Sequence, residues 1–203
     1  NHEIALILTN EDKPSGRGKK LTKPPVKIFA EVNNIEFKQP AMLKDNLLID
    51  FLKNKEADLF VVFAYGHLIP EEILKIFKKG ALNIHTSLLP KLRGAAPIQR
   101  AIINGDKLTG LTFMKMEKGL DTGPIYRQDN IEIDREETSD SLEKKMSKVS
   151  SSKIIEVIDL IEKNNLKLIS QNNESATYAP KISREETKIN WSMKATAIAN
   201  LIN

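Results

Sequence analysis

Residues 58–65 read DLFVVFAY and form an almost continuously apolar run. A short run of this kind predicts a strand that is buried on both faces, as in a parallel sheet. Residues 4–8 (IALIL) repeat the pattern near the start of the chain. Such strands require a layer of helices on each side of the sheet, so this feature limits the chain to folds that combine helices with a largely parallel sheet.

Helical periodicity alternates with further strands along the chain. The predicted helices cover residues 43–52, 70–80, 97–104, 140–163 and 191–202, and the predicted strands cover residues 81–85, 112–116 and 125–133. Thr138 or Ser139 suits the N-cap of the longest helix, and residues 171–175 (QNNES) suit a surface loop. The pattern predicts the α/β class: a mostly parallel sheet with helices on both faces.

Composition narrows the possible functions. The 203 residues are 40% hydrophobic and 29% charged, which is typical of a globular protein. Cysteine is absent and histidine occurs three times, so we assign no metal site. No segment approaches the roughly 18 apolar residues of a membrane helix, and no secretion signal opens the sequence. We expect a bacterial cytoplasmic protein, or an organellar one if the source is eukaryotic. The net charge of +4 permits a polyanionic partner without requiring one.

Three polar residues are candidates for chemistry. Asn83 and His85 alternate by two at the end of a predicted strand and share one face. Asp121 lies in the glycine-flanked loop at residues 119–123 (GLDTG). A carboxylate beside an imidazole favours the imidazolium, and an amide with an imidazolium provides two donors for one developing oxyanion. A histidine at a strand end is more often a packing residue, and an aspartate between glycines is most often a turn residue, so spacing alone leaves both interpretations open.

Longer motifs favour the chemical interpretation. Residues 83–90 (NIHTSLLP), 93–100 (RGAAPIQR), 104–106 (NGD) and 119–123 resemble the signature of the 10-formyltetrahydrofolate-dependent formyltransferases. The resemblance covers nearly the whole chain. It implies a nucleotide-binding-like α/β domain that uses 10-formyltetrahydrofolate as formyl donor and needs no metal. It also implies that Asn83 and protonated His85 stabilise the oxyanion of a tetrahedral intermediate, while Asp121 holds His85 and helps to remove the amine proton.

Two further segments are candidates for contact with folate. A pteridine ring needs a flat apolar slot and exposed backbone groups that read its edges. Ligands of α/β sheets bind beyond the carboxyl ends of the strands, so we expect the segments after residues 58–65 and 81–85 near one crevice. Together with the resemblance, this predicts folate contacts from Tyr65, Gly66, His67, Leu68, Ser87, Leu88, Leu89 and Pro90. A strand–helix connection with ordinary core side chains is the alternative for the first four.

A long basic loop spans Thr9 to Pro25 and does not match the phosphate-binding P-loop pattern. With several glycines and no apolar stripe, we expect Gly16 to Lys20 to be weakly ordered without RNA. An inserted basic loop at this position resembles the formyltransferases that act on methionyl-tRNA, and it implies tRNA contacts from Arg17, Lys19 and Lys20. The predicted activity is therefore formyl transfer to methionyl-initiator tRNA. A formyltransferase acting on a ribonucleotide or an amino-sugar nucleotide, and a catalytically silent folate-binding module, remain alternatives.

The resemblance also bears on domain organisation. The first strand of the family would precede Asn1, and its C-terminal β-barrel domain would follow Asn203. We expect residues 1–180 to form the catalytic domain without that strand, and residues 181–203 to lead towards the barrel. As partners we expect methionyl-initiator tRNA and folate, no DNA and no membrane, with the protein a monomer.

Overall fold

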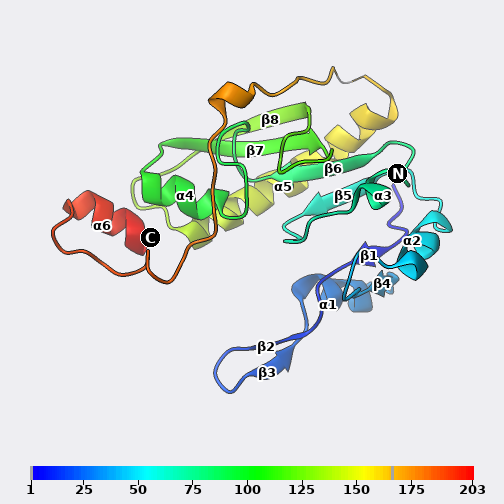
Figure 1. Cartoon of the computed structure of the whole chain (residues 1–203), viewed down its shortest axis with the longest axis horizontal. Helices are drawn as coiled ribbons and strands as arrows, with labels where there is room; N and C mark the ends of the chain where they lie inside the picture. Colours follow the sequence, from blue (N-terminus) through cyan, green and yellow to red (C-terminus); the bar gives the residue numbers. More distant parts are fainter. Residues whose placement is uncertain (1, 166) are drawn as a thin grey trace. The chain divides into compact units, whose positions relative to one another are not determined.

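The computed structural model of the chain describes residues 2–165 and 167–203 (Figure 1). These residues divide into two compact units. The first comprises the described residues up to Phe60 together with Tyr65–Gly80, and the second comprises Val61–Ala64 and the described part of Ala81–Asn203.

The first unit packs short helices against a parallel pair of strands. Strand β1 (Ile7–Leu8) pairs with β4 (Phe37–Lys38), and the helices are α1 (Pro25–Val32), α2 (Asn46–Lys53) and α3 (Glu71–Leu74). The Asp45 carboxylate caps α2 by accepting a hydrogen bond from Leu47 N. The core of this unit contains Leu48, Leu52, Ile73 and Phe77. This cluster joins α2 to the segment that contains α3.

The basic segment forms a β-hairpin that projects beyond α1 (Figure 1). Strand β2 (Lys13–Ser15) pairs antiparallel with β3 (Lys20–Thr22), and all six residues are exposed. Gly16 and Gly18 turn the chain with φ angles of 68° and 91°, and Lys19 N donates to Gly16 O at 3.2 Å. The prediction of a loop without structure is wrong, because cross-strand backbone pairing needs no apolar pattern in the side chains.

The second unit contains a four-stranded sheet in the order β5-β6-β7-β8. The strands are β5 (Phe60–Phe63), β6 (Ala81–His85), β7 (Leu108–Lys115) and β8 (Ile125–Glu132). The α/β class is confirmed, but the sheet is mixed rather than mostly parallel, since β7 runs antiparallel to both β6 and β8. The connection between β7 and β8 is a short loop without a helix, and a parallel pair would need a longer crossover.

Helices complete the second unit. These are α4 (Pro97–Asn104), the long α5 (Ser139–Glu162), the 3-10 turn η1 (Asn173–Ser175) and α6 (Ala195–Ile202). Helix α5 packs against β7 and β8, and α4 packs against both α5 and α6. Phe113, Leu142 and Met146 are fully buried where the sheet meets α5. No helix in the described part of the chain combines the length and the apolar character needed to cross a membrane.

Several predicted elements differ from the observed ones. Strand β5 exists, but it is not buried on both faces: Val61 and Phe63, which alternate along the strand and therefore share one face, are both exposed. The helix predicted between Pro70 and Gly80 contains only α3, and α1 and β4 were not predicted at all. Residues 81–85 and 97–104, by contrast, form the predicted strand and helix with the predicted bounds.

Candidate active site

His85 is the last residue of β6, and only 6% of its surface is exposed. Its Nε2 lies 2.9 Å from the carbonyl oxygen of Leu92. A carbonyl can only accept, so Nε2 carries a hydrogen and donates it. This contact fixes the ring and leaves Nδ1 as the nitrogen that faces Asp121.

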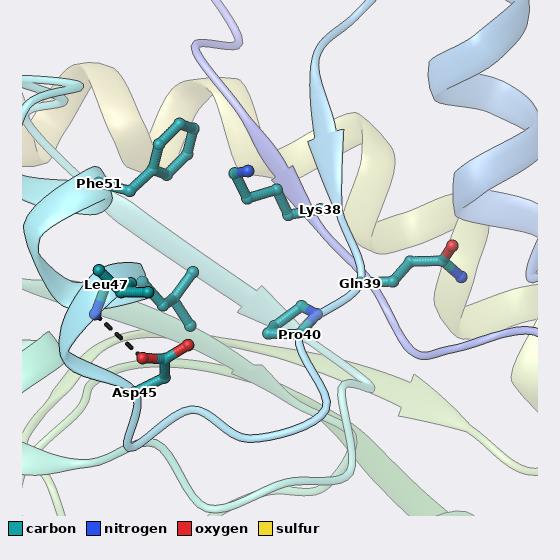
Figure 2. Close-up of a pocket in the computed structure, with 7 residues that line it drawn as sticks. Lys38, Gln39, Pro40, Asp45, Leu47 and Phe51 are labelled. Carbon is teal, nitrogen blue, oxygen red and sulfur yellow. Dashed lines mark hydrogen bonds between the residues drawn. The ribbon is translucent and has the colours of Figure 1, made fainter.

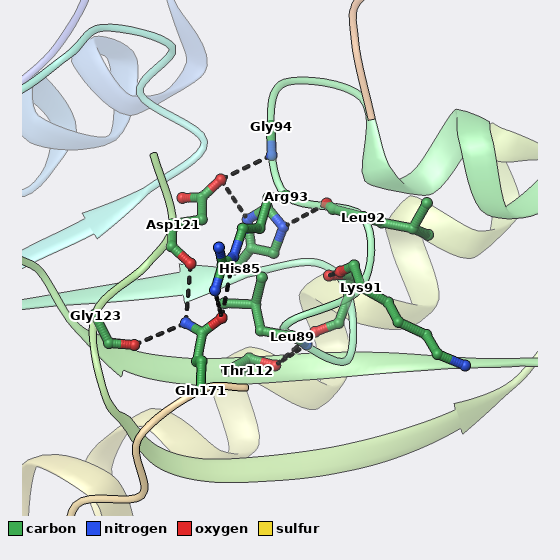
Figure 3. A network of polar contacts seen from close by, with 11 residues as sticks. His85, Leu89, Lys91, Leu92, Arg93, Gly94, Thr112, Asp121, Gly123 and Gln171 are labelled. Atoms are coloured by element: carbon green, nitrogen blue, oxygen red, sulfur yellow. Dashed lines mark hydrogen bonds and ion pairs between the residues drawn. The ribbon is translucent and has the colours of Figure 1, made fainter. Parts of the chain in front are cut away.

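Asp121 lies in the loop between β7 and β8 and has a φ of 53°, in the left-handed region. Its Oδ2 is 3.7 Å from His85 Nδ1 and accepts a hydrogen bond from Gly94 N at 2.8 Å (Figure 3). The His85 and Asp121 side chains are only 7% and 15% exposed. The structure therefore brings together two of the three predicted catalytic residues in a largely dry environment.

Asn83 is the third predicted catalytic residue, and it lies on β6 two positions before His85. It pairs in register with Met114 of β7, and it is half-buried. The alternation of a strand directs its side chain to the same face as that of His85. No ion pair or hydrogen bond among the described residues joins Asn83 to His85 or Asp121, so its role in the site stays a prediction.

The segment Leu92–Gly94 contacts both His85 and Asp121. Leu92 contributes the carbonyl that accepts from His85, and Gly94 contributes the amide that donates to Asp121. Gly94 has a φ of 119°, and an added Cβ would lie 2.9 Å from Ala179 O. The position therefore requires glycine both for its backbone angle and for its close approach to the neighbouring chain.

Gln171 was not predicted as a site residue, yet it hydrogen-bonds to the loop that carries Asp121. Its Nε2 donates to the carbonyls of Asp121 at 2.9 Å and Gly123 at 2.7 Å. Its Oε1 accepts from the buried side chain of Arg93. The sequence predicts a surface loop at residues 171–175, because the local sequence carries no signal of these long-range contacts.

The turn at Ser87–Pro90 follows β6 and is held by a hydrogen-bond network. Thr112 Oγ1 donates to Ser87 O at 2.6 Å and accepts from Leu89 N at 3.1 Å. Ser87 Oγ donates to Lys91 O, and the Leu89–Pro90 peptide bond is cis. Ser87 and Leu89 are buried, whereas Leu88 and Pro90 are half-exposed. Of the four residues predicted to contact folate here, Leu88 and Pro90 therefore present the accessible side chains.

The other predicted folate segment, Tyr65–Leu68, belongs to the first unit. Asn10 Nδ2 donates to Tyr65 O at 3.3 Å, and Asn10 Oδ1 lies 2.6 Å from His67 Nε2. Burial raises the pKa of the Tyr65 phenol. Gly66, His67 and Leu68 are exposed, and Gly66 has a φ of 78°. The segment is an exposed loop held by hydrogen bonds to Asn10, and its contacts with folate stay a prediction.

Comparison with known proteins identifies the family. Residues 1–158 match the formyl transferase family. The chain belongs to this family. It is 44% identical over 201 residues to a methionyl-tRNA formyltransferase of Alkaliphilus oremlandii and 45% identical over 200 residues to one of Thermodesulfovibrio yellowstonii. These alignments cover 99% and 98% of the chain, and the chain spans 65% of the length of each relative.

A solved structure supports the same fold. The chain resembles the crystal structure of WlaRD, a sugar 3N-formyl transferase, in the presence of dTDP and 5-N-formyl-THF. The TM-score is 0.70 with 22% sequence identity, and the alignment covers 100% of this chain and 79% of WlaRD. At this identity the likeness shows a formyl transferase fold and no more.

The hairpin of this formyl transferase chain carries the three residues predicted to contact tRNA. Arg17 lies between Gly16 and Gly18 in the turn, Lys19 follows with a φ of 47°, and Lys20 opens β3. All three are exposed. The base of the hairpin is fastened by an ion pair between Lys27 and Asp12 at 2.8 Å. The structure thus places three cations at the tip of a projection with an anchored base.

The first unit also has an open pocket of about 380 Å³ beside the N-terminus of α2 (Figure 2). Lys38 Nζ lies 4.2 Å from the centre of the Phe51 ring on one wall, and Asp45 and Pro40 lie on another. None of the residues predicted to take part in catalysis, folate binding or tRNA binding lines this pocket. It therefore supports none of the predicted folate or tRNA contacts.

Proposed function

We propose that this protein transfers the formyl group of 10-formyltetrahydrofolate to the amino group of methionyl-initiator tRNA. The observation that carries the proposal is the His85–Asp121 pair, with Nδ1 and Oδ2 3.7 Å apart and each residue tied to the Leu92–Gly94 backbone. Relatives named methionyl-tRNA formyltransferase, 44% and 45% identical, support the choice of reaction.

The proposed reaction begins when the methionyl amine attacks the formyl carbon. A carbon–nitrogen bond forms, and the carbonyl oxygen becomes the oxyanion of a tetrahedral intermediate. His85, protonated on Nδ1, stabilises this oxyanion together with the Asn83 carboxamide. The intermediate collapses by breaking the bond between the formyl carbon and N10 of the folate. The amine loses a proton and N10 gains one, so the overall step is balanced.

Asp121 has two tasks in this scheme. Its Oδ2 faces His85 Nδ1 and stabilises a positive charge on the ring, because opposite charges attract strongly at short range in a dry site. Both described contacts of the carboxylate use Oδ2. Oδ1 is therefore the oxygen that we assign to accept the amine proton, directly or through one water.

Substrate contacts complete the proposal. Tyr65, Gly66, His67 and Leu68, and separately Ser87, Leu88, Leu89 and Pro90, contact the folate. Arg17, Lys19 and Lys20 contact phosphates of the tRNA, since exposed cations on a flexible turn neutralise a nucleic-acid backbone. We place residues 1–180 in the catalytic domain and assign 181–203 as the linker. The protein acts as a monomer in the cytoplasm.

Transfer to an amino-sugar nucleotide is the rival function, since the same fold occurs in WlaRD, a sugar 3N-formyl transferase. The two functions differ in what the acceptor offers. A sugar nucleotide needs a compact pocket, whereas a tRNA needs exposed positive charge that can neutralise its phosphates. The hairpin with Arg17, Lys19 and Lys20 supplies exposed positive charge, as a tRNA requires.

The test supplies full-length protein and 10-formyltetrahydrofolate with one of three acceptors: methionyl-initiator tRNA, glycinamide ribonucleotide or an amino-sugar nucleotide. Formylated product is measured for each, and folate binding is followed in parallel. We expect product with the tRNA. Product with a small acceptor alone would replace the proposal with its rival, and folate binding without any product would indicate a silent binding module.

A further inference from the structure

The Gln171 carboxamide bridges the Asp121 loop and a buried arginine (Figure 3). Its Nε2 donates to Asp121 O at 2.9 Å and to Gly123 O at 2.7 Å. Its Oε1 accepts from Arg93 Nε at 3.1 Å and Arg93 Nη2 at 2.7 Å. A carboxamide has two donor hydrogens and two acceptor lone pairs, so all four of its hydrogen-bonding positions are used.

These contacts require an amide in this orientation. The guanidinium of Arg93 only donates, and the two loop carbonyls only accept. A carboxylate at position 171 would keep the pair with Arg93 but would set a negative oxygen against two carbonyl oxygens. A flipped amide would set donors against the donors of Arg93. The site thus distinguishes glutamine from its isosteric acid.

The bridge closes a ring of contacts around Asp121. The Asp121 side chain accepts from Gly94 N, Gly94 follows Arg93 in the chain, and Arg93 holds Gln171, which in turn holds Asp121 O. Arg93 is 2% exposed, and its Nη2 also donates to Asn173 Oδ1 at 2.9 Å. Side chain and backbone of Asp121 are therefore held from the same short segment.

The segment that carries Gln171 is anchored on both sides of this residue. Ile169 exchanges two backbone hydrogen bonds with Ile125 at the start of β8, at 2.8 and 2.9 Å. Further along, Arg93 N donates to Thr177 O at 2.9 Å, and Ala179 N donates to Arg93 O at 2.7 Å. Residues 169–179 are thus anchored at both ends, and this anchoring holds Gln171 beside the loop that carries Asp121.

The loop needs such support because its backbone is unusual. Asp121 has a φ of 53°, which L-residues other than glycine seldom adopt. Gly123 approaches the β7 backbone so closely that an added Cβ would lie 1.8 Å from Lys115 O. Gln171 Nε2 donates hydrogen bonds to the carbonyls of Asp121 and Gly123, the residues on either side of Thr122.

We propose that Gln171, held by Arg93, is a positioning residue that sets the Asp121 carboxylate against His85 and Gly94. This proposal rests on the proposed formyl transfer for its kinetic consequences, and on the hydrogen-bond geometry alone for its structural ones. Gln171 lies beyond residues 1–158, which match the family, so this contribution comes from a segment outside that match.

The decisive variant is Gln171→Glu, which keeps the shape and the Arg93 contact but removes both donations to the loop. The matched control is Asn172→Asp, the same amide-to-acid change on the adjacent exposed residue, which can still cap η1. We expect Gln171→Glu to lower kcat about 10- to 100-fold, as small misplacements of catalytic groups do, with the KM values for folate and tRNA within about twofold of wild type. The control should leave both parameters unchanged.

A double-mutant cycle separates positioning from general structural damage. If Gln171 acts through Asp121, Gln171→Glu should cost little further activity once Asp121→Asn is present. Full additivity of the two losses, or a parallel fall in kcat and in the melting temperature, would overturn the proposal.

A second readout does not depend on activity. The Gly94 amide proton bonds directly to Asp121 Oδ2, so its NMR chemical shift reports where the carboxylate lies. It should move in Gln171→Glu and stay in Asn172→Asp. An unmoved Gly94 signal would overturn the positioning role even if formyl transfer itself were confirmed. A moved signal in a protein that forms no formylated product would uphold the role and refute the proposed function.

Discussion

Nδ1 of His85 faces Oδ2 of Asp121 at 3.7 Å, a separation longer than a hydrogen bond. The other ring nitrogen donates to Leu92 O, so a neutral ring presents the Nδ1 lone pair to a carboxylate. A proton on Nδ1 converts this contact into an attraction and allows the two groups to close. This arrangement is the basis of the catalytic role that we propose for His85 and Asp121.

The first prediction concerns Asp121→Asn. The asparagine carbonyl can still accept from Gly94 N, so the shape of the site is kept while the negative charge is lost. We expect kcat to fall about 10²- to 10⁴-fold, the range for loss of a positioned acid–base group, with folate affinity within about twofold of wild type. Steady-state formylation and folate titration measure the two quantities.

Asp140→Asn is the control for this prediction, since it makes the same chemical change at an exposed position in the first turn of α5. It should leave kcat unaltered. Equal losses of turnover and of folate affinity in Asp121→Asn would instead mark Asp121 as a residue that shapes the binding site.

The second prediction concerns the capping box of α5. Thr138 Oγ1 accepts from Ser141 N at 3.1 Å, and Ser141 Oγ accepts from Thr138 N at 2.9 Å. Thr138→Ala leaves the Ser141 amide without its side-chain acceptor, while residue 138 N can still donate to Ser141 Oγ, and should lower the free energy of unfolding by about 1 kcal/mol. Urea denaturation measures this change. Ser151→Ala, an exposed substitution inside the same helix, should stay within about 0.5 kcal/mol of wild type, and equal effects of the two would show that the cap contributes nothing.

The elements that could be predicted from sequence are those whose signal is local. Residues 81–85 form a strand in which apolar Leu82 and Ile84 alternate with polar Asn83 and His85. Residues 97–104 form a helix that begins at Pro97 and ends before Gly105, whose φ of 72° is expected beyond a C-terminus. The directions in which the strands pair within the sheet depend on tertiary packing and could not be predicted from the sequence. The hairpin was missed because its exposed strands carry no hydrophobic alternation.

His85 and Asp121 could be predicted because they lie in motifs that resemble a known family, and the structure brings them together. Gln171 could not, because its partners are distant in sequence and a polar stretch with two asparagines looks like a solvated loop. Long-range hydrogen bonds to backbone carbonyls have no signature in a single sequence.

The third prediction concerns pH and the attachment of residues 181–186 to α4. Arg100 pairs with Glu186 and also donates to Pro180 O at 3.0 Å. The Arg100 guanidinium, together with the Ser183 amide, lowers the pKa of Glu186 from 4.5 to about 2. An acid with a depressed pKa stabilises the folded form above its unfolded value, and this contribution is lost as the pH falls through the folded value. The attachment should hold at pH 4.5 and loosen as the pH approaches 2.

NMR can follow this loosening at one atom, because Ser183 N donates to Glu186 Oε1 at 2.9 Å. The Ser183 amide signal should titrate with a midpoint well below 4.5. Arg100→Gln removes the charge that holds the carboxylate and should move the midpoint upward. A wild-type midpoint at 4.5, or one that Arg100→Gln does not change, would show that the ion pair is not maintained in solution.

The last prediction concerns the hairpin and the choice of acceptor. Arg17 is exposed at the tip, and a ribbon of two three-residue strands is marginally stable by itself, so contact with phosphates should order it. Arg17→Ala should raise the KM for methionyl-tRNA roughly tenfold, the value of one charge-assisted hydrogen bond, and leave folate affinity and the melting temperature unchanged. The salt dependence of this KM should also weaken, by about 0.7 to 0.9 in the log–log slope for each lost phosphate contact. Arg17→Lys should recover part of the loss, because lysine keeps the charge without the planar fork of donors.

Lys148→Ala, which removes one exposed positive charge from α5, is the control and should change neither KM nor slope. The measurement is steady-state formylation at two salt concentrations, and wild-type kinetics from Arg17→Ala would remove the main reason to prefer a tRNA to a small acceptor.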